Sequence, residues 1–269
     1  MNPAEPGIDA TPGPRQRVAG MPRWTRPASV IGEFVGTLVR GLLPGRWRRT
    51  MRREFMDYLY EVGIRAMPAT IVAALLVGLG LVLQIIYWLS FAGQGQSIDD
   101  FLVLILVRQV APVVTALVII GRSGSVLVDE IGRLAQGGHL RQLLSQGIHP
   151  VELITIPRSF AMASACLLLT IVFMHTALWT GALAAAAAGL TTNTALDTVV
   201  DVLTRMTTAD HLLLIVKPLL IGYVVAYVSI WLGMRVPYAR PGVRRLLPKA
   251  FIGSLLATFA IGAITSAVF

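Results

Sequence analysis

The sequence predicts an all-α integral membrane protein with about five membrane-spanning helices. Hydrophobic residues make up 55% of the chain and the mean hydropathy is +0.70. Only 14% of the residues are charged, compared with about 25% in an ordinary soluble domain. The apolar residues also gather in blocks of roughly 20 or more, the length that a helix needs to cross a bilayer. Together these observations predict a multi-pass helical membrane protein.

Five stretches are long and apolar enough to span a membrane. They cover residues 66–92, 101–121, 159–190, 212–234 and 250–269. The third stretch is long enough for a tilted span with an alanine-rich extension. The chain is therefore expected to cross the bilayer an odd number of times, which places its two ends on opposite sides.

The distribution of basic residues predicts which side each end occupies. If the amino end is inside, the cytosolic segments are 1–65, 122–158 and 235–249. They hold 20 of the 23 lysines and arginines, whereas the external loops hold only Arg205. An excess of Lys and Arg in cytosolic loops is the usual topology signal of membrane proteins. We therefore expect a cytoplasmic amino terminus and an external carboxyl terminus.

The segment before the first span divides into two parts. Residues 1–28 are rich in proline and have no apolar core, which predicts a disordered cytosolic tail. Residues 29–65 begin with a stretch, 29–43, that places Phe34 and Leu38 at helical spacing but is too short and too charged to span. A helix lying in the membrane interface, followed by a basic juxtamembrane run, fits this pattern. A helix packed on cytosolic protein is the alternative.

The segment 122–158 is too long for a structureless connection in a compact membrane protein. Within it, 129–145 is predicted to form short helical pieces broken at Gly137, with Gly147 and Pro150 ending the last piece. A short amphipathic helix on the cytosolic side could dock a partner protein. The alternative is a helix that only folds back on the membrane.

Motifs for catalysis or cofactor binding are absent from the sequence. No G-x-x-x-x-G-K-[ST] loop and no H-E-x-x-H pair occurs, and the four histidines are scattered. Ser123 lacks the G-x-S-x-G spacing of a nucleophile elbow. The basic residues follow membrane topology rather than a nucleic-acid-binding face. We therefore expect no catalytic residue, metal, cofactor or nucleic-acid partner.

A small set of polar residues falls inside the predicted spans and supplies the candidate substrate-binding residues. They are Gln84 in the first span, Arg108 and Gln109 in the second, and Lys217 in the fourth. An ionisable residue at membrane depth is costly, so it usually faces a partner, a cavity or an aqueous path. The alternative is snorkelling toward the interface, since Lys217 is only some five residues from the outer end of its span.

Three segments, in order, resemble one known family. They are YEVGIRAMPATIVAALLVGLGLVLQ (60–84), LVRQVAPVVTALVIIGRSGSVLVDEIG (106–132) and GIHPVELITIPR (147–158). They are similar to characteristic segments of the MlaE/YrbE ABC-transporter permeases, the membrane subunits of systems with an MCE-domain lipid-binding partner. The resemblance runs from about Val30 to the end of the chain.

The resemblance implies an architecture and a set of partners. An interfacial elbow helix would precede a five-span permease domain, residues 66–269, with a coupling helix in the loop 122–158. Two permease subunits would pair, an ATPase dimer would bind at the coupling helix, and an MCE protein would bind on the outer face. The cargo would be phospholipid or a related lipid, ATP would be used by the separate ATPase, and the location would be a bacterial inner membrane with a periplasmic carboxyl terminus.

The resemblance also implies residue roles. Arg108 and Gln109 fall on the family's Arg-Glu pair, and Lys217 on its fourth-span lysine. The residues expected to couple to the ATPase are Glu130, Arg133, His139, Arg141, Leu144, Gly147 and Pro150.

The sequence departs from the family pattern at several acidic positions, and these departures leave alternatives for the binding partners and for the function. The glutamate expected after the arginine is Gln109, and an acidic residue late in the last span is replaced by Ile261. Arg108 and Lys217 would then need a lipid phosphate, a partner's carboxylate or water. The coupling loop has lost two acids, which implies a different ATPase surface or one half of a heterodimer. Besides a lipid permease, a non-translocating scaffold that assembles an MCE complex is therefore the alternative function.

Overall fold

The computed structural model describes residues 27–42, 47, 49–94, 97–147, 151–190, 194–234 and 243–268, and all regular secondary structure in these segments is helical. The elements are α1 (Pro27–Gly41), α2 (Arg49–Val77), η3 (Gly78–Val82), α3 (Leu83–Phe91), α4 (Ile98–Leu102), η5 (Val103–Val110), α5 (Ala111–Ile119), η6 (Ile120–Gly124), α6 (Ser125–Gln136), α7 (His139–Ser145), η7 (Val151–Thr155), α8 (Ile156–Ala187), α9 (Ala195–Arg205), α10 (Thr208–Met234) and α11 (Val243–Val268). The four η elements are π-helical. The expected all-α fold is confirmed.

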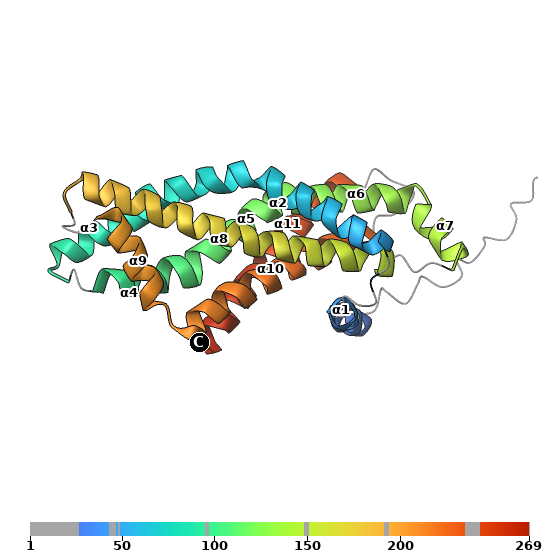
Figure 1. Ribbon diagram of the computed structural model, residues 1–269. Coiled ribbons are helices and arrows are strands. Elements are labelled where there is room, and N and C mark those ends of the chain that lie inside the picture. The colour runs from blue at the N-terminus through green and yellow to red at the C-terminus, as the bar shows by residue number, and fades with distance from the viewer. Residues whose placement is uncertain are drawn as a thin grey trace, which may run out of the picture.

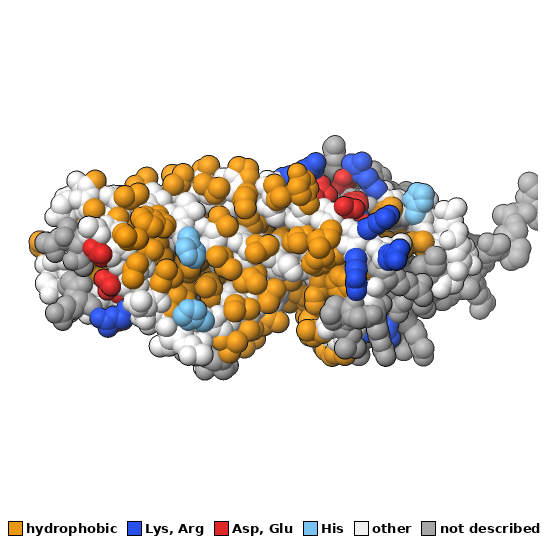
Figure 2. Space-filling model, in the orientation of Figure 1, with side chains coloured by type: hydrophobic (Ala, Val, Ile, Leu, Met, Phe, Trp, Pro, Cys, Tyr) orange, Lys and Arg blue, Asp and Glu red, His pale blue; other side chains and the backbone are white. Residues whose placement is uncertain are grey.

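Consecutive elements join into five helices that are long and apolar enough to cross a membrane. They are Arg49–Phe91, Ile98–Gln136, Leu153–Ala187, Thr208–Met234 and Leu247–Ala267. Figure 1 shows them packed lengthwise into an elongated bundle, with α9 at one end and α7 at the other. On the face shown in Figure 2, hydrophobic side chains cover the middle and charged side chains lie toward the two ends, as expected for a bilayer-spanning bundle. The five predicted spans are therefore confirmed.

The first two helices are longer than the spans that the sequence predicts. They contain 43 and 39 residues, or about 65 and 60 Å at 1.5 Å per residue, roughly twice the hydrocarbon thickness of a bilayer. The first begins at Arg49 rather than 66, and the second continues to Gln136 rather than ending at 121. The juxtamembrane residues from Arg49 onward and the start of the predicted loop are thus helical extensions of the spans.

The helix predicted over 29–43 is present as α1, which is seen nearly end-on in Figure 1 while the spans run across the picture. Its Phe34 ring meets the rings of Tyr223 and Tyr227 edge-on, with centroids 5.2 and 5.1 Å apart. The Thr37 and Tyr223 hydroxyls are hydrogen-bonded at 2.6 Å. These contacts fix α1 against α10, while its placement in a membrane interface stays a prediction. Residues 1–26 of the predicted tail lie outside the described residues.

Helix α9 occupies part of the segment 191–211, where only an external loop is expected from hydropathy. Thr194 is its N-cap: the Thr194 hydroxyl accepts a hydrogen bond from the Asp197 backbone N–H, and the Asp197 carboxylate accepts one from the Thr194 backbone N–H. This reciprocal capping box satisfies two backbone donors of the first turn. Hydrogen bonds from the Thr194 hydroxyl and backbone also lower the pKa of Asp197. The T-x-x-D pattern is the sequence signal that marks the start of this helix.

Small residues allow the central spans to approach closely. Helices α8 and α10 are in close contact at Gly222, where an added Cβ would lie 2.7 Å from the Met162 carbonyl oxygen and 2.8 Å from the Ala163 Cα. Both contacts involve backbone, which cannot move aside as a flexible side chain can. The crossing of α8 and α10 therefore requires glycine at this position.

Replacing Gly222 with alanine is expected to destabilise the bundle by about 1–3 kcal/mol, the usual cost of overpacking a core. Thermal unfolding of the detergent-solubilised chain measures the effect. Gly262→Ala is the matched control, because a Cβ at Gly262 meets no atom within 4 Å. Equal melting temperatures for the two variants would contradict the described α8–α10 crossing.

Candidate functional site

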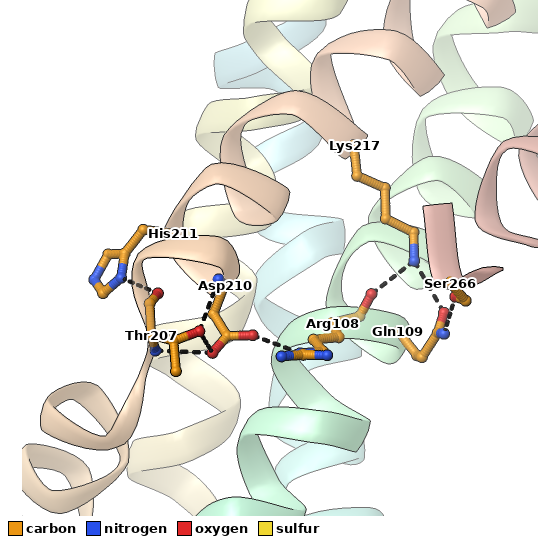
Figure 3. A network of polar contacts seen from close by, with 7 residues as sticks. All are labelled: Arg108, Gln109, Thr207, Asp210, His211, Lys217 and Ser266. Carbon is orange, nitrogen blue, oxygen red and sulfur yellow. Dashed lines mark hydrogen bonds and ion pairs between the residues drawn. The ribbon is translucent and has the colours of Figure 1, made fainter. Parts of the chain in front are cut away.

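Three spans contribute polar side chains to one site, which we call the polar cluster and show in Figure 3. The second span supplies η5, the fourth supplies α10 and the fifth supplies α11. The members of the cluster are Arg108, Gln109, Thr207, Asp210, Lys217 and Ser266. The cluster therefore joins helices that are far apart in the sequence. These helices are otherwise mainly apolar.

Lys217 points into the bundle and is almost fully buried, with 2% of its surface exposed. Its Nζ donates hydrogen bonds to the Arg108 carbonyl oxygen at 2.7 Å and to Gln109 Oε1 at 2.9 Å. The snorkelling alternative is therefore wrong for this residue. Both acceptors are neutral, so the hydrogen bonds stabilise the ammonium group without cancelling its charge.

Pro112 removes one possible hydrogen-bond donor near the Arg108 carbonyl that Lys217 binds. In a regular α-helix the N–H of residue 112 would donate to the carbonyl of Arg108, four residues earlier, but proline has no N–H. The surrounding segment, η5, is π-helical rather than α-helical. Segments of this kind are frequent at functional sites. The Arg108 carbonyl receives no hydrogen bond from residue 112, and it accepts one from the buried Lys217.

Arg108 forms an ion pair with Asp210, from Nε to Oδ1. Asp210 is 2% exposed, and its Oδ2 accepts hydrogen bonds from the backbone N–H and the hydroxyl of Thr207, at 2.8 and 2.7 Å. The expectation that Arg108 lacks an acidic partner within the chain is therefore wrong. Asp210 is not among the predicted site residues because it lies before the fourth hydrophobic block. The pattern Thr207-x-x-Asp210, which is typical of a helix start, is the sequence signal that could have identified it.

Of the two remaining predicted residues, Gln109 belongs to the polar cluster and Gln84 lies on the surface of the bundle. Gln109 donates from Nε2 to Ser266 Oγ while its Oε1 accepts from Lys217. Gln84 is on an exposed face of α3, and no hydrogen bond among the described residues joins it to the cluster. The structure therefore brings three of the four predicted residues together and leaves Gln84 apart.

The cluster keeps one net positive charge. Arg108 and Asp210 offset one another, whereas Lys217 meets neutral acceptors alone within the described part of the chain. In a low-dielectric environment such a charge attracts an anionic group strongly. Among the described residues, no three His, Cys, Asp or Glu side chains are placed to hold a metal ion. The arrangement can attract a single negatively charged group.

The predicted coupling residues lie at the α6–α7 end of the bundle. As expected, the chain breaks at Gly137 and Gly138 and resumes as α7, and the positive φ angles of Gly138 (+76°) and Gly147 (+73°) suit glycine. Arg133 is exposed and pairs with Asp129 at 2.8 Å, and His139 is exposed. The side chains of Arg141 and Leu144, and all of Pro150, lie outside the described residues.

Glu130 is half-exposed and contacts another span. Its Oε1 accepts a hydrogen bond from Arg158 Nη2 at 2.8 Å. Contact of this whole group of residues with an ATPase remains a prediction.

Five helices that are long and apolar enough to cross a membrane, three of them joined by the polar cluster, define the chain as a multi-pass helical membrane protein. The sequence model of the family Permease MlaE matches residues 55–268. The chain belongs to this family.

Individual relatives are distant but cover much of the chain. A probable ABC transporter permease of Synechocystis is 26% identical over 78% of this chain and 80% of its own length. The chloroplastic TRIGALACTOSYLDIACYLGLYCEROL 1 protein of Arabidopsis thaliana is 24% identical over 89% of this chain, but the match spans 66% of that relative. The intermembrane phospholipid transport system permease MlaE of Haemophilus influenzae is 28% identical over 55% of this chain and 57% of its own length.

Proposed function

We propose that this chain is the permease subunit of an ABC transporter that moves phospholipid or a related lipid, without hydrolysing ATP itself. Membership of the Permease MlaE family over residues 55–268 carries the proposal. A relative of this family is named as an intermembrane phospholipid transport permease. The polar cluster, with its one net positive charge, supports it, because many lipid head groups carry a negatively charged phosphate.

In this proposal Lys217 and Gln109 contact the lipid head group. Lys217 supplies the positive charge, and the ion pair between Arg108 and Asp210 holds η5 and α10 in register beside it. An ammonium group acts as a point charge that binds a phosphate from many directions. The acyl chains would then lie along the apolar faces of the neighbouring spans.

A second permease subunit is part of the proposal. The first and fifth spans are the least buried of the five within one chain. Gln109 and Ser266 are also exposed in the single chain, although both fall within spans. Polar groups at membrane depth usually face protein or a water-filled cavity rather than lipid tails. We infer that a second copy or a related permease covers this face and encloses the lipid.

Coupling to ATP would take place at α7, with an ATPase dimer in the cytoplasm and an MCE-domain protein at the α9 end. The basic residues near the α6–α7 end favour a cytoplasmic location for that end, a periplasmic carboxyl terminus and the inner membrane.

Copurification tests these partners: tagged chain coexpressed with its genomic neighbours should retain an ATPase, an MCE protein and phospholipid. Lipid-loaded chain without either partner would count against the proposal.

Charge reversal at Arg141 tests the docking surface. Arg141→Glu is expected to reduce the ATPase that copurifies with the chain by about tenfold, because a charge of the wrong sign at an interface costs on the order of 1.4 kcal/mol or more. Arg205→Glu, at the opposite end of the bundle on α9, is the control and should retain the ATPase. Unchanged copurification of Arg141→Glu would remove α7 as the docking site.

A non-translocating scaffold is the second candidate. It is favoured by one observation, the ion pair that already occupies Arg108 within the chain. A scaffold would assemble the same partners, or act as the degenerate half of a heterodimer, without moving lipid. Lipid movement by the reconstituted complex distinguishes the two functions, since copurification alone does not.

A further inference from the structure

Three charged residues from three different helices meet near the α6–α7 end of the bundle. Arg158, in the first turn of α8, donates from Nε to Glu54 Oε1 of α2 at 2.8 Å. Its Nη2 donates to Glu130 Oε1 of α6 at 2.8 Å and also lies 2.7 Å from Glu54 Oε1. We call these three residues the clasp, because they close three helices around one guanidinium group.

The clasp is costly to build, which indicates that its geometry matters. Arg158 is 8% exposed, and its guanidinium carbon lies 5.4 Å from the centre of the Tyr58 ring. Its Nη1 is buried and has no hydrogen-bond partner among the described residues. The Glu54 and Glu130 side chains are 37% and 42% exposed, so burial falls mainly on the guanidinium group. Desolvation of that group offsets part of the attraction, and such pairs seldom add much net stability. A role in fixing the relative positions of helices accounts better for this arrangement.

The position of the clasp in the chain is informative. Glu130 lies six residues before the end of α6, and Arg158 lies two residues after the start of α8. Between these helices the chain leaves the spans and forms α7. The ion pair therefore joins the two sides of the segment that carries α7, directly at its base. Glu54 connects the same point to the first span, so that three spans share one junction.

We propose that the clasp transmits movement of α7 to the first three spans together. This inference rests on the proposed function, in which an ATPase displaces α7. Without the clasp, α6 and α8 could bend separately at the base of the segment and absorb that displacement. With it, the displacement reaches α2, α6 and α8 as one body. The three residues are positioning residues, since none of them contacts the lipid site.

Single amide substitutions separate the two halves of the clasp. Glu54→Gln keeps the Glu130–Arg158 pair and releases only α2, whereas Glu130→Gln keeps the Glu54–Arg158 pair and opens the base of the α7 segment. Each variant retains one carboxylate for the buried arginine, so the guanidinium is never left without a charged partner. Both variants are therefore expected to fold and to retain the ATPase, which melting temperature and copurification verify.

The test measures lipid moved per ATP hydrolysed by the complex in vesicles containing fluorescent phosphatidylglycerol. Each variant is expected to reduce this ratio at least about fivefold, the lower end of typical coupling between sites, while ATP hydrolysis continues. Glu61→Gln is the matched control, because Glu61 on the same helix forms an exposed pair with Arg65 at 3.1 Å. Its ratio should equal that of the unchanged chain.

Arg158→Lys provides a second, conservative test. Lysine keeps the positive charge but lacks the rigid fork that reaches two carboxylates at once. An intermediate ratio is therefore expected, and a loss that simply follows melting temperature would show a structural role only. If the unchanged complex moves lipid and both glutamine variants keep the full ratio, the clasp proposal is wrong. If the unchanged complex hydrolyses ATP without moving lipid, the proposed function itself fails.

Discussion

Replacing Asp210 with alanine is expected to lower the free energy of unfolding by about 3 kcal/mol, as when one partner of a buried ion pair is removed. Two losses combine at this position. Arg108 loses its carboxylate partner, and the first turn of α10 loses the acceptor for the Thr207 backbone N–H. Chemical or thermal unfolding in detergent, followed by circular dichroism, measures the change.

A matched residue elsewhere in the chain separates these two losses. Asp197 has the same T-x-x-D capping arrangement at the start of α9, bonded to Thr194 but with no arginine bonded to it among the described residues. Asp197→Ala should therefore show only the smaller capping effect. A double variant, Asp210→Ala with Arg108→Met, should recover part of the loss by removing the unpaired charge. Equal destabilisation by the two aspartate variants would mean that the buried ion pair contributes nothing.

Replacing Lys217 with methionine is expected to reduce transport of an anionic phospholipid by about tenfold or more. Hydrogen bonds to charged groups contribute about 1.5–3 kcal/mol, which corresponds to roughly 10- to 100-fold in binding. Methionine preserves most of the volume and the apolar stem, so packing around α10 should change little. The measurement is ATP-driven transfer of labelled phosphatidylglycerol by the reconstituted complex.

The control is Lys249→Met, because Lys249 is an exposed lysine on α11 outside the polar cluster. It should leave transfer unchanged. The loss in Lys217→Met should also be smaller for a zwitterionic lipid than for phosphatidylglycerol, because only the anionic head group depends on the net charge. Equal transfer by Lys217→Met and the unchanged chain would exclude Lys217 from the lipid site.

The spans could be predicted from the sequence because uninterrupted hydrophobic blocks of about 20 residues rarely form anything except a membrane-spanning helix. Their ends could not, since charged segments carry no comparable signal. Glu130 lies in a segment that is predicted to form a separate short helical piece outside the spans, yet it belongs to the helix that continues the second span, and it is bonded to Arg158 of another span. Such extensions depend on tertiary contacts between residues far apart in the chain, which local patterns do not contain.

In the candidate site, too, the residues inside the spans could be predicted from the sequence but their contacts could not. Arg108 and Lys217 could be identified because a cation inside a hydrophobic block is costly and requires a reason. Their partners could not, because Asp210 is 102 residues from Arg108 and only helix packing brings the two together. Gln84 also falls within a span, but it is exposed and no hydrogen bond among the described residues joins it to the cluster. The position of a residue along a span can be predicted from the sequence. The side of the helix that faces the bundle cannot, when apolar residues lie all around that helix.

The central claim is that this chain moves lipid in a complex driven by a separate ATPase. The most direct measurement reconstitutes the purified complex in vesicles and follows labelled phospholipid leaving the bilayer for a soluble MCE-domain acceptor after ATP is added. Transfer should require ATP and should stop when the catalytic glutamate of the ATPase is replaced by glutamine. An assembled complex that hydrolyses ATP while the labelled lipid stays in the bilayer would contradict this claim and favour the scaffold.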